Sequence, residues 1–290
     1  MGVAAVGAAC VGWGFVEAHA FTTRRATVPV LDRGAAPICV LHLSDLHFTP
    51  SQRDKVAWMS SLASEAPDLV VVTGDNLGHV DAVPTVAEAL APLLGIPGLF
   101  VFGSNDYVGP RPVNPFAYFG GPSRMRSARA PLPTEKLRSV FTDAGWKDLN
   151  NARARVTVAG IELTAVGMDD PHIGRDAMPP TEGERGSLHL GVVHAPYARA
   201  LMALTDDAVD VMFAGHTHGG QVCVPGFGAL VTNCDLDRGR VKGLSSWPGV
   251  YGDPESTWLH VSAGAGTSPY APVRFACRPE ATVLTLVARE

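Results

Sequence analysis

The stretch ICVLHLSDLH, residues 38–47, places a short apolar run directly before polar side chains. The apolar part predicts a buried β-strand that ends at Ser44-Asp45. Apolar side chains at helical spacing then predict a helix over residues 51–66, and a second strand follows. Because strands alternate with helices, we expect βαβ units with a parallel sheet and an α/β fold class. These elements continue with a strand at 68–73, a helix at 83–94 and a strand at 98–102.

The second half of the chain continues the pattern around two long loops. Residues 107–133, rich in Pro, Gly and aromatic side chains, predict a long surface loop, and residues 169–186 predict a second, polar loop. No internal repeat or linker divides residues 31–290, which we interpret as one domain. The other expected elements are a helix at 134–144, a hairpin of 155–158 with 161–166, strands at 188–193, 209–214 and 282–287, and a helix at 196–204.

The composition argues against one class of function. The chain has 290 residues, a formal net charge of −5 and no block of Lys and Arg, so broad electrostatic binding to nucleic acid is not expected. Its five cysteines include no C-x-x-C pair, which favours free buried thiols over a disulfide framework or a zinc knuckle. A disulfide between Cys223 and Cys234, which flank a candidate turn, stays open as an alternative.

The N-terminal segment, residues 1–30, is set apart from the domain. Residues 1–16 carry no charged side chain, but this run is slightly shorter than the about 20 apolar residues that cross a bilayer. It lacks a basic n-region, although the Ala-His-Ala sequence at 18–20 resembles a cleavage site. We interpret it as a membrane anchor or an uncleaved signal, which predicts a membrane-associated protein. The alternative is an apolar helix that packs on the domain.

Five short polar motifs come directly after apolar runs. In an open α/β sheet, ligands bind beyond the carboxyl ends of the strands, so motifs far apart in the sequence can form one site. Their Asp, His and Asn side chains suit divalent metals such as Mn, Fe or Zn. The motifs are Asp45-Leu46-His47, Gly74-Asp75-Asn76, Gly103-Ser104-Asn105-Asp106, His194-Ala195-Pro196 and Gly215-His216-Thr217-His218-Gly219-Gly220.

Two neighbouring cations suit one reaction in particular, the hydrolysis of a phosphate ester. Such an ester is anionic and repels hydroxide. Two divalent ions about 3.5–4 Å apart offset this charge, orient the ester and acidify a water between them. Holding two cations so close requires a shared anionic ligand, which a carboxylate provides, while neutral histidines complete each shell.

These motifs, in this order, resemble those of the calcineurin-like metallophosphoesterase superfamily: D-x-H, G-D, G-N-H-[DE], a lone His and G-H-x-H. The resemblance spans about Ile38 to Val287. The G-H-T-H-G-G-Q motif and the tail around Ser262–Ser268 and Pro272–Phe275 resemble its bacterial membrane-associated branch. The resemblance implies a four-layer α/β/β/α sandwich in one domain, with two mixed β-sheets flanked by helices. It also implies a metal-dependent phosphoesterase with two divalent ions.

The resemblance further implies a role for each matching residue. A carboxylate of the second motif would bridge the two ions, and an amide oxygen of the third motif would join the second ion. The first ion would be held by Asp45, His47 and His218, the second by Asn105, His194 and His216, and both by Asp75.

The third motif departs from the family pattern, because Gly103-Ser104-Asn105-Asp106 stands where relatives read Gly-Asn-His-Asp. Without a gap, Ser104 takes the ligand position and Asn105 that of the acid/base histidine; with a small backbone shift, Asn105 is the ligand instead. Both alternatives lose the histidine, and we assign the catalytic positions to Asn105 and Asp106. General acid catalysis contributes about 10²–10⁴-fold. We therefore expect weaker protonation of the leaving group or another proton donor, for which His79 and His172 are candidates.

The remaining histidines and arginines lie outside the five motifs. His42 and His189 lie within predicted strands and are interpreted as core or packing residues, and His260, also in a strand, is assigned no role. The loop arginines face either solvent or, as part of a lid, a substrate phosphate, and Arg274 is a similar candidate. These loop arginines are Arg111, Arg124, Arg126 and Arg129.

The leading hypothesis is hydrolysis of a phosphate mono- or diester. The apolar N-terminus favours a lipid-linked ester, and a nucleotide is the other candidate substrate. The altered third motif supports an alternative from another class, a metal-binding scaffold or regulatory membrane protein with weakened catalysis. A third interpretation keeps the fold but takes a protein phosphoresidue or a sulfate as the substrate.

Overall fold

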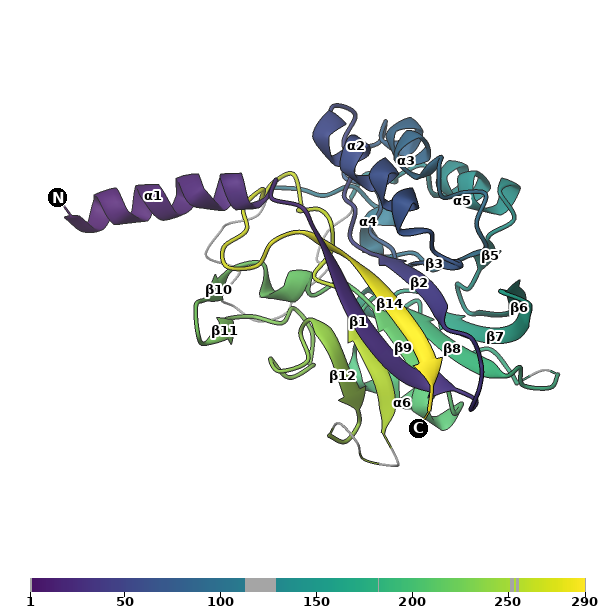
Figure 1. Ribbon diagram of the computed structural model, residues 1–290. Coiled ribbons are helices and arrows are strands. Elements are labelled where there is room, and N and C mark those ends of the chain that lie inside the picture. The colour runs from purple at the N-terminus through teal and green to yellow at the C-terminus, as the bar shows by residue number, and fades with distance from the viewer. Residues whose placement is uncertain (1, 113–128, 182, 251–252, 254–255, 290) are drawn as a thin grey trace.

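Two six-stranded sheets face each other in the computed structural model, and helices lie on their outer sides (Figure 1). The structure describes residues 2–112, 129–181, 183–250, 253 and 256–289. The expected four-layer arrangement of two mixed sheets flanked by helices is therefore confirmed.

The first sheet has the strand order β1-β14-β2-β3-β4-β5. Strands β2 to β5 run parallel to one another, whereas β14 is antiparallel to β2 and parallel to β1. The parallel part arises from the predicted strand and helix alternation. The strands are β1 Thr22–Leu31, β2 Ile38–Leu43, β3 Leu69–Val72, β4 Gly98–Phe100, β5 Lys147–Asp148 and β14 Glu280–Ala288.

The second sheet has the order β12-β13-β9-β8-β7-β6. Strands β13, β9, β8 and β7 are parallel, and an antiparallel strand closes each edge. The expected hairpin is β6 with β7, and the expected strand at 188–193 is β8. The strands are β6 Ala152–Val158, β7 Ile161–Met168, β8 Leu188–Val193, β9 Val211–Ala214, β12 Gly243–Trp247 and β13 Thr257–Val261.

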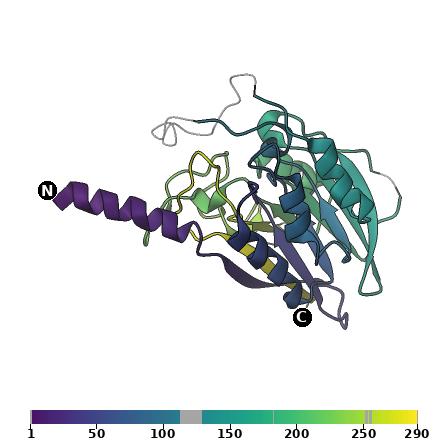
Figure 2. The same cartoon turned by 90° about the horizontal axis from the view of Figure 1, so that it is seen from above.

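Helices α2, α3 and α5 lie on the outer side of the first sheet, and α6 covers the second (Figures 1 and 2). The predicted helix at 51–66 ends earlier as an α-helix and continues as the 3₁₀ turn η1. Two short helices, α4 and the 3₁₀ turn η3, stand near the strand ends. The helices are α2 Arg53–Ser61, η1 Leu62–Glu65, α3 Val83–Leu90, α4 Ser104–Tyr107, α5 Thr134–Asp143, η3 Pro171–Ile173, α6 Ala198–Asp206 and η4 His218–Gly220.

The pleat of β2 shows how one strand serves two cores. Leu41 and Leu43 are fully buried against the helices of the first sheet, while Val40 is buried between the two sheets. Alternate side chains of a strand point to opposite faces, so a strand covered on both faces is apolar throughout. A third core lies between the second sheet and α6, where Leu201 and Leu204 pack.

The N-terminal helix α1, Gly2–Glu17, corrects the expected membrane anchor. Within the described residues, no helix is long and apolar enough to cross a membrane. The 16 residues of α1 span about 24 Å at 1.5 Å per residue, less than the hydrocarbon thickness of about 30 Å. The predicted membrane-associated localisation is therefore wrong. Figures 1 and 2 show α1 projecting away from the sandwich.

The C-terminal end of α1 is attached to the segment before β14. The buried carboxylate of Glu17 accepts the backbone N–H groups of Ala276 and Cys277 at 3.0 and 2.7 Å. The indole N–H of Trp13 donates to the same carboxylate at 2.9 Å. Strand β1 then joins the first sheet beside β14. The boundary expected at residue 30 thus falls inside a strand that the sequence analysis did not predict.

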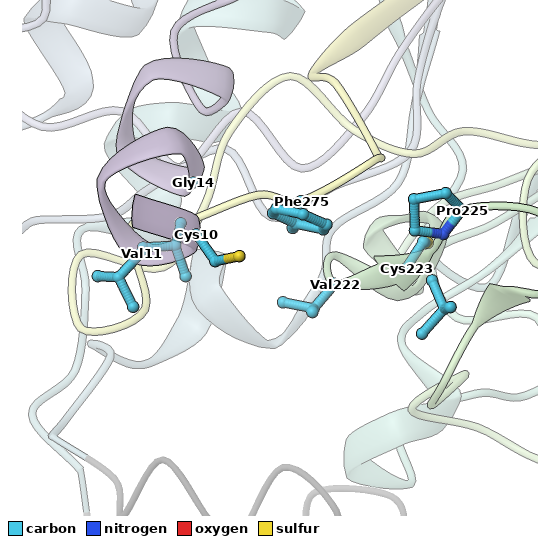
Figure 3. Close-up of a pocket in the computed structure, with 9 residues that line it drawn as sticks. Cys10, Val11, Gly14, Val222, Cys223, Pro225 and Phe275 are labelled. Carbon is cyan, nitrogen blue, oxygen red and sulfur yellow. The ribbon is translucent and has the colours of Figure 1, made fainter. Parts of the chain in front are cut away.

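A pocket of about 420 Å³ lies between α1 and a short hairpin of β10, Cys223–Val224, and β11, Gly228–Ala229 (Figure 3). Its walls are apolar side chains and two cysteines, Cys10 and Cys223. All five cysteines are free, so the alternative disulfide between Cys223 and Cys234 is absent. None of the residues that line this pocket is a candidate metal ligand.

Candidate metal centre

The carboxyl ends of parallel strands in both sheets carry the predicted motifs to one place. Asp45 follows β2 and Asp75 follows β3, while His194 follows β8 and His216 follows β9. The backbone N–H of Asp45 donates to the carbonyl of Gly74 at 2.9 Å, so the first and second motifs lie side by side. The fold therefore brings together segments that are far apart in the sequence.

Two groups of side chains place their ligand atoms within 4.8 Å of one another. One group is Asp45, His47 and His218, and the other is Asp45, Asp75 and His194. In the first, Nε2 of His47 lies 3.2 Å from Nε2 of His218, which is 3.5 Å from a carboxylate oxygen of Asp45. Lone pairs of two imidazoles and a carboxylate that converge in this way form a site for a divalent cation.

The carboxylate of Asp75 connects the two groups. Its Oδ2 lies 3.6 Å from Nε2 of His47, and its Oδ1 lies 3.5 Å from Nε2 of His194. Asp75 therefore reaches one histidine of each group, as a carboxylate shared between two ions must.

One buried nitrogen shows that the residues fit a metal. Nδ1 of His194 lies 2.6 Å from the carbonyl of Thr73, so it donates its proton there and the lone pair is on Nε2. This Nε2 is buried and has no hydrogen-bond partner. Buried polar atoms without partners are costly, and a cation beside Asp75 would satisfy this one. The carbonyl contact orients the ring, as is usual for metal-binding histidines.

His216 lies next to these groups but in neither of them. Its ring centroid is 5.2 Å from that of His194, and its backbone N–H donates to the carboxylate of Asp45 at 3.0 Å. Nε2 of His216 lies 3.2 Å from the carbonyl of Asn233. Nε2 also lies 3.2 Å from the side-chain amide nitrogen of Asn233, so the ring either donates to the carbonyl and keeps its lone pair on Nδ1, or accepts from the amide and keeps its lone pair on Nε2.

The backbone at the centre is strained. Five of the seven candidate ligands have positive φ angles, a conformation that costs roughly 1–3 kcal/mol for a non-glycine residue. Such strain persists only where surrounding contacts impose it, and it clusters at functional sites. The five residues are Asp45, His47, Asp75, His216 and His218.

Burial sets the charge of most of these groups. It lowers the pKa of His47 to about 4 and holds the pKa values of His216 and His218 well below their usual range. These rings are therefore neutral and keep a lone pair for a cation. Burial opposes ionisation of Asp75, but the neighbouring His194 holds the pKa of its carboxyl well below the usual range. Burial also opposes the charge of His194, but the carboxylate of Asp75 holds its pKa well above the usual range, so without a cation this ring is charged. The centre thus presents an ionised Asp75 carboxylate paired with His194, beside the neutral rings of His47, His216 and His218.

The altered third motif forms the start of α4. The backbone N–H and the side-chain amide of Asn105 both donate to the carboxylate of Asp75, each at 2.7 Å. Ser104 is buried beside it. The amide of Asn105 therefore lies at the metal centre, next to the carboxylate that connects the two groups.

Asp106 has different surroundings from Asn105. It is fully buried, and its carboxylate accepts the backbone N–H groups of Gly103, Asp75 and Asn76 at 2.8–3.0 Å. Burial raises the pKa of this carboxyl to about 7, and the charge of Asp75 adds to the shift. Asp106 connects the second and third motifs through their backbones.

We expect Gly103→Ala to reduce metal binding while the fold is retained. A Cβ atom at this position would lie 2.3 Å from Oδ1 of Asp75 and 2.6 Å from Nε2 of His194. Both atoms would have to move away from the place where a cation binds. Elemental analysis of the purified variant should show the loss. Gly95→Ala is the matched control, because a Cβ there meets nothing within 4 Å; equal metal content in the two variants would contradict the prediction.

Several supporting residues were not found from the sequence. Lys55 is 3% exposed, and its ammonium group donates to the carbonyls of Leu46 and His47 at 2.6 and 3.3 Å. It thereby fixes the backbone of the first motif. Ser44 donates to the carboxylate of Asp45 at 2.6 Å. Only the position of Ser44 beside a motif signalled its role, and nothing local marks Lys55 as buried.

The burial of Lys55 predicts a pH-dependent stability. Burial lowers its pKa from 10.5 to about 7 in the folded chain. Between these values the unfolded chain binds the proton and the folded chain does not, so stability rises with pH, by at most about 1.4 kcal/mol per pH unit. Urea unfolding of chelator-treated protein between pH 7 and 10 should show this rise. The Lys55→Met variant should show a flatter curve, and identical slopes would contradict the assignment.

The arginines that were expected to face solvent or a substrate phosphate differ in their surroundings. Arg274 is fully buried, and its guanidinium donates to the carbonyls of Ala263, Gly264 and Gly266 at 2.7–3.0 Å. It supports the loop against Asp45 and does not face solvent or a substrate, contrary to the expectation. Arg124 and Arg126 lie outside the described residues.

Arg129 is part of the segment that returns from the long loop. Ala130 accepts the backbone N–H of Gly109 at 2.9 Å, which places Arg129 close to the end of α4. Its Nε is buried without a partner. Burial and the charge of Arg111 lower the pKa of Arg129, and Asp75 raises it. The guanidinium is thus within the electrostatic reach of the metal centre.

The remaining histidines divide into two kinds. Nδ1 of His42 lies 2.7 Å from Nδ1 of His260 between the two sheets, and His189 is buried against Thr164 at 2.9 Å. His42 and His189 are buried within the fold, as expected, although His189 also contacts the carboxylate of Asp207 at 2.8 Å; His260, to which no role was assigned, is buried beside His42. His172, one of the two candidate proton donors, has its ring centroid 4.5 Å from that of His216.

A four-layer α/β/β/α sandwich with Asp and His side chains gathered beyond its strand ends defines the class of metal-dependent hydrolases to which the motifs pointed. The chain belongs to the calcineurin-like phosphoesterase family, because the model of that family matches residues 39–220, more than half of its 290 residues. It is a metal-dependent phosphoric ester hydrolase.

Curated relatives agree with this family. The chain is 26% identical over 307 residues to the uncharacterized metallophosphoesterase YkuE of Bacillus subtilis, with 98% of this chain and 94% of the relative covered. It is 28% identical to the phosphodiesterase YaeI of Escherichia coli, with 87% and 83% covered. Among solved structures, TT1561 of Thermus thermophilus aligns with a TM-score of 0.42 and 10% identity, covering 79% of this chain and 90% of that chain.

Proposed function

We propose that this enzyme holds two divalent ions, Mn, Fe or Zn, and hydrolyses a phosphate mono- or diester with water. The observation that carries the proposal is the position of Asp75, whose two carboxylate oxygens lie 3.6 and 3.5 Å from a histidine of each ligand group. One cation would need only one such group, whereas a shared carboxylate between two groups favours a pair.

The ligands divide around Asp75. When bound, the ions would offset the negative charge of the phosphate and acidify the attacking water. The amide of Asn105 now donates to Asp75 through its nitrogen, and half a turn of the amide presents its oxygen to the second ion instead. The first ion is assigned to Asp45, His47 and His218, the second to Asn105, His194 and His216, and Asp75 is assigned to both.

Asp106 contributes by positioning. Its carboxylate is fully buried and is occupied by three backbone N–H groups, so it holds Asp75 and Gly103 at a fixed separation. We assign to Arg129 a contact with the phosphate, because its Nε is buried without a partner and its segment pairs with Gly109, just after α4. An arginine is suited to an anionic phosphate oxygen.

Hydrolysis of p-nitrophenyl phosphate and bis(p-nitrophenyl) phosphate with Mn²⁺ tests the proposal. We expect turnover that disappears when a chelator removes the metal and returns when Mn²⁺ is restored. A nucleotide diester and a lipid phosphate extend the panel to the two substrate classes expected from the sequence. Metal-loaded protein that turns over none of these esters would contradict the proposed function.

A further inference from the structure

The chain contains ten histidines, all within the described residues, and four of them are assigned to metals. A histidine that replaces the one missing from the third motif must therefore be among the other six. Only His172 has its ring against the ring of an assigned ligand. The other five lie elsewhere. His19 follows α1, and His79 lies beside Asp81 with its side chain half exposed. His42 and His260 lie between the sheets, and His189, in β8 of the second sheet, contacts Asp207.

Two contacts define how His172 is oriented. Its ring centroid lies 4.5 Å from that of His216, on the side of the second ligand group. Its Nδ1 lies 3.1 Å from the hydroxyl of Tyr197, at the start of α6. When the hydroxyl donates to Nδ1, the ring carries its proton on Nε2.

The loop that carries His172 is bound to the helix that contains the altered motif. Tyr107, the last residue of α4, donates its hydroxyl to Asp169 at 2.8 Å, and Arg175 donates to the same carboxylate at 2.7 Å. Asp170 accepts the backbone N–H of His172 at 2.8 Å and caps the 3₁₀ turn η3. The loop therefore holds His172 at a set position relative to the helix that begins with Ser104.

We propose that His172 is a catalytic residue that takes the place of the histidine missing from the third motif, donating its Nε2–H to the oxygen that leaves the phosphate. This inference rests on the proposed phosphoesterase function. The geometry that supports it is the ring contact with His216, the orientation imposed by Tyr197 and the connection of its loop to α4.

The step balances without a further reactant. The oxygen of the attacking water forms a new bond to phosphorus, and the bond from phosphorus to the alcohol oxygen breaks. The electron pair of the broken bond stays on the alcohol oxygen, where the hydrogen bond from His172 stabilises the developing negative charge. The attacking water loses one proton to solvent, and the alcohol oxygen takes one from solvent while the Nε2–H of His172 stays on the ring, so the products are an alcohol and a phosphate.

The experiment compares two esters whose leaving groups differ in how strongly they depend on stabilisation of the leaving oxygen. Phenolate is a poorer leaving group than p-nitrophenolate, so phenyl phosphate depends more on a hydrogen bond to this oxygen. We expect His172→Ala to lower kcat for phenyl phosphate by about 10²–10³-fold and for p-nitrophenyl phosphate by much less, with unchanged metal content. Tyr197→Phe should lower kcat in the same selective way but by a smaller factor. His79→Ala is the control: the side chain of His79 is half exposed, and this variant should have the kcat of the wild type for both esters.

A gain-of-function variant separates catalysis from folding. Ser104→Asn with Asn105→His restores the family motif, and in the His172→Ala background it should recover turnover of phenyl phosphate selectively. Equal losses on both esters, loss of metal in His172→Ala, or full activity of that variant would each overturn the role of His172. Wild-type protein that hydrolyses neither ester would overturn the proposed function and this inference with it.

Discussion

Asp75→Asn is expected to lose at least one metal ion and to lower kcat/KM by on the order of 10³-fold or more. The substitution removes one negative charge from between the two ligand groups, where the carboxylate lies 3.6 Å from His47 and 3.5 Å from His194. In the proposed two-ion centre, the neighbouring cations would then repel each other without a negative charge between them. The shape of the side chain is kept, so the hydrogen bond from the backbone of Asn105 can persist.

Metal content by elemental analysis and turnover of p-nitrophenyl phosphate are the two measurements for Asp75→Asn. Asp81→Asn is the matched control, because its side chain is 77% exposed and lies outside the metal centre. We expect two ions and full activity in the control. Two ions per chain in Asp75→Asn would show that this carboxylate does not bridge them.

Arg274→Met is expected to produce the largest loss of stability, at least about 3 kcal/mol, or a decrease in Tm of at least about 6 °C. Its guanidinium is fully buried and donates to the carbonyls of Ala263, Gly264 and Gly266. Methionine fills similar space but donates nothing, so the buried carbonyls of Ala263 and Gly266 lose the guanidinium, while that of Gly264 keeps the backbone N–H of Glu280. Each such loss costs roughly 1–3 kcal/mol.

The effect of Arg274→Met should extend to the metal centre. A Cβ at Gly264 would lie 2.6 Å from the Cβ of Asp45, which shows how closely this loop approaches the first motif. We therefore expect weaker metal binding as well as lower stability, measured by thermal unfolding with and without Mn²⁺. Arg278→Met is the control: Arg278 also donates to carbonyls, those of Ala20 and Phe21, but it is exposed. Similar losses in both variants would contradict the importance of burial.

The alternation of strands and helices was predictable because each signal is local. An apolar run of about five residues before a polar group marks a buried strand and its end, and this pattern identified β2, β3, β8 and β9. The ligand residues follow directly from those ends. Asp45 and His194 could therefore be named before their separation in space was known, since parallel strands of this fold bring their carboxyl ends together.

The N-terminal segment was interpreted less well because its length and hydropathy were considered without its contacts. Residues 22–31 form β1 only because β14, at the other end of the chain, supplies a parallel partner. The helix before it ends at Glu17, whose carboxylate is bound to the backbone of Ala276 and Cys277. No local pattern encodes a partner about 260 residues away.

Charged and polar residues away from the motifs were the least predictable. Lys55 and Arg274 have charged side chains, which are usually found at the surface, yet both are buried. Each donates to backbone carbonyls of a loop elsewhere in the chain, such as those of Leu46 and Ala263. His79 and His172 were equal candidates from the sequence. The structure places His172 against His216 and leaves His79 half exposed.

The sequence by itself determined which side chains are candidate metal ligands and at which strand ends they lie, because the apolar residues of a buried strand and the polar residue after it are neighbours in the sequence. Only the tertiary structure decided which buried charges support those ligands and which remaining histidine stands beside them. The physical reason is that hydrogen bonding and desolvation depend on groups from distant segments, which meet only when the two sheets pack together.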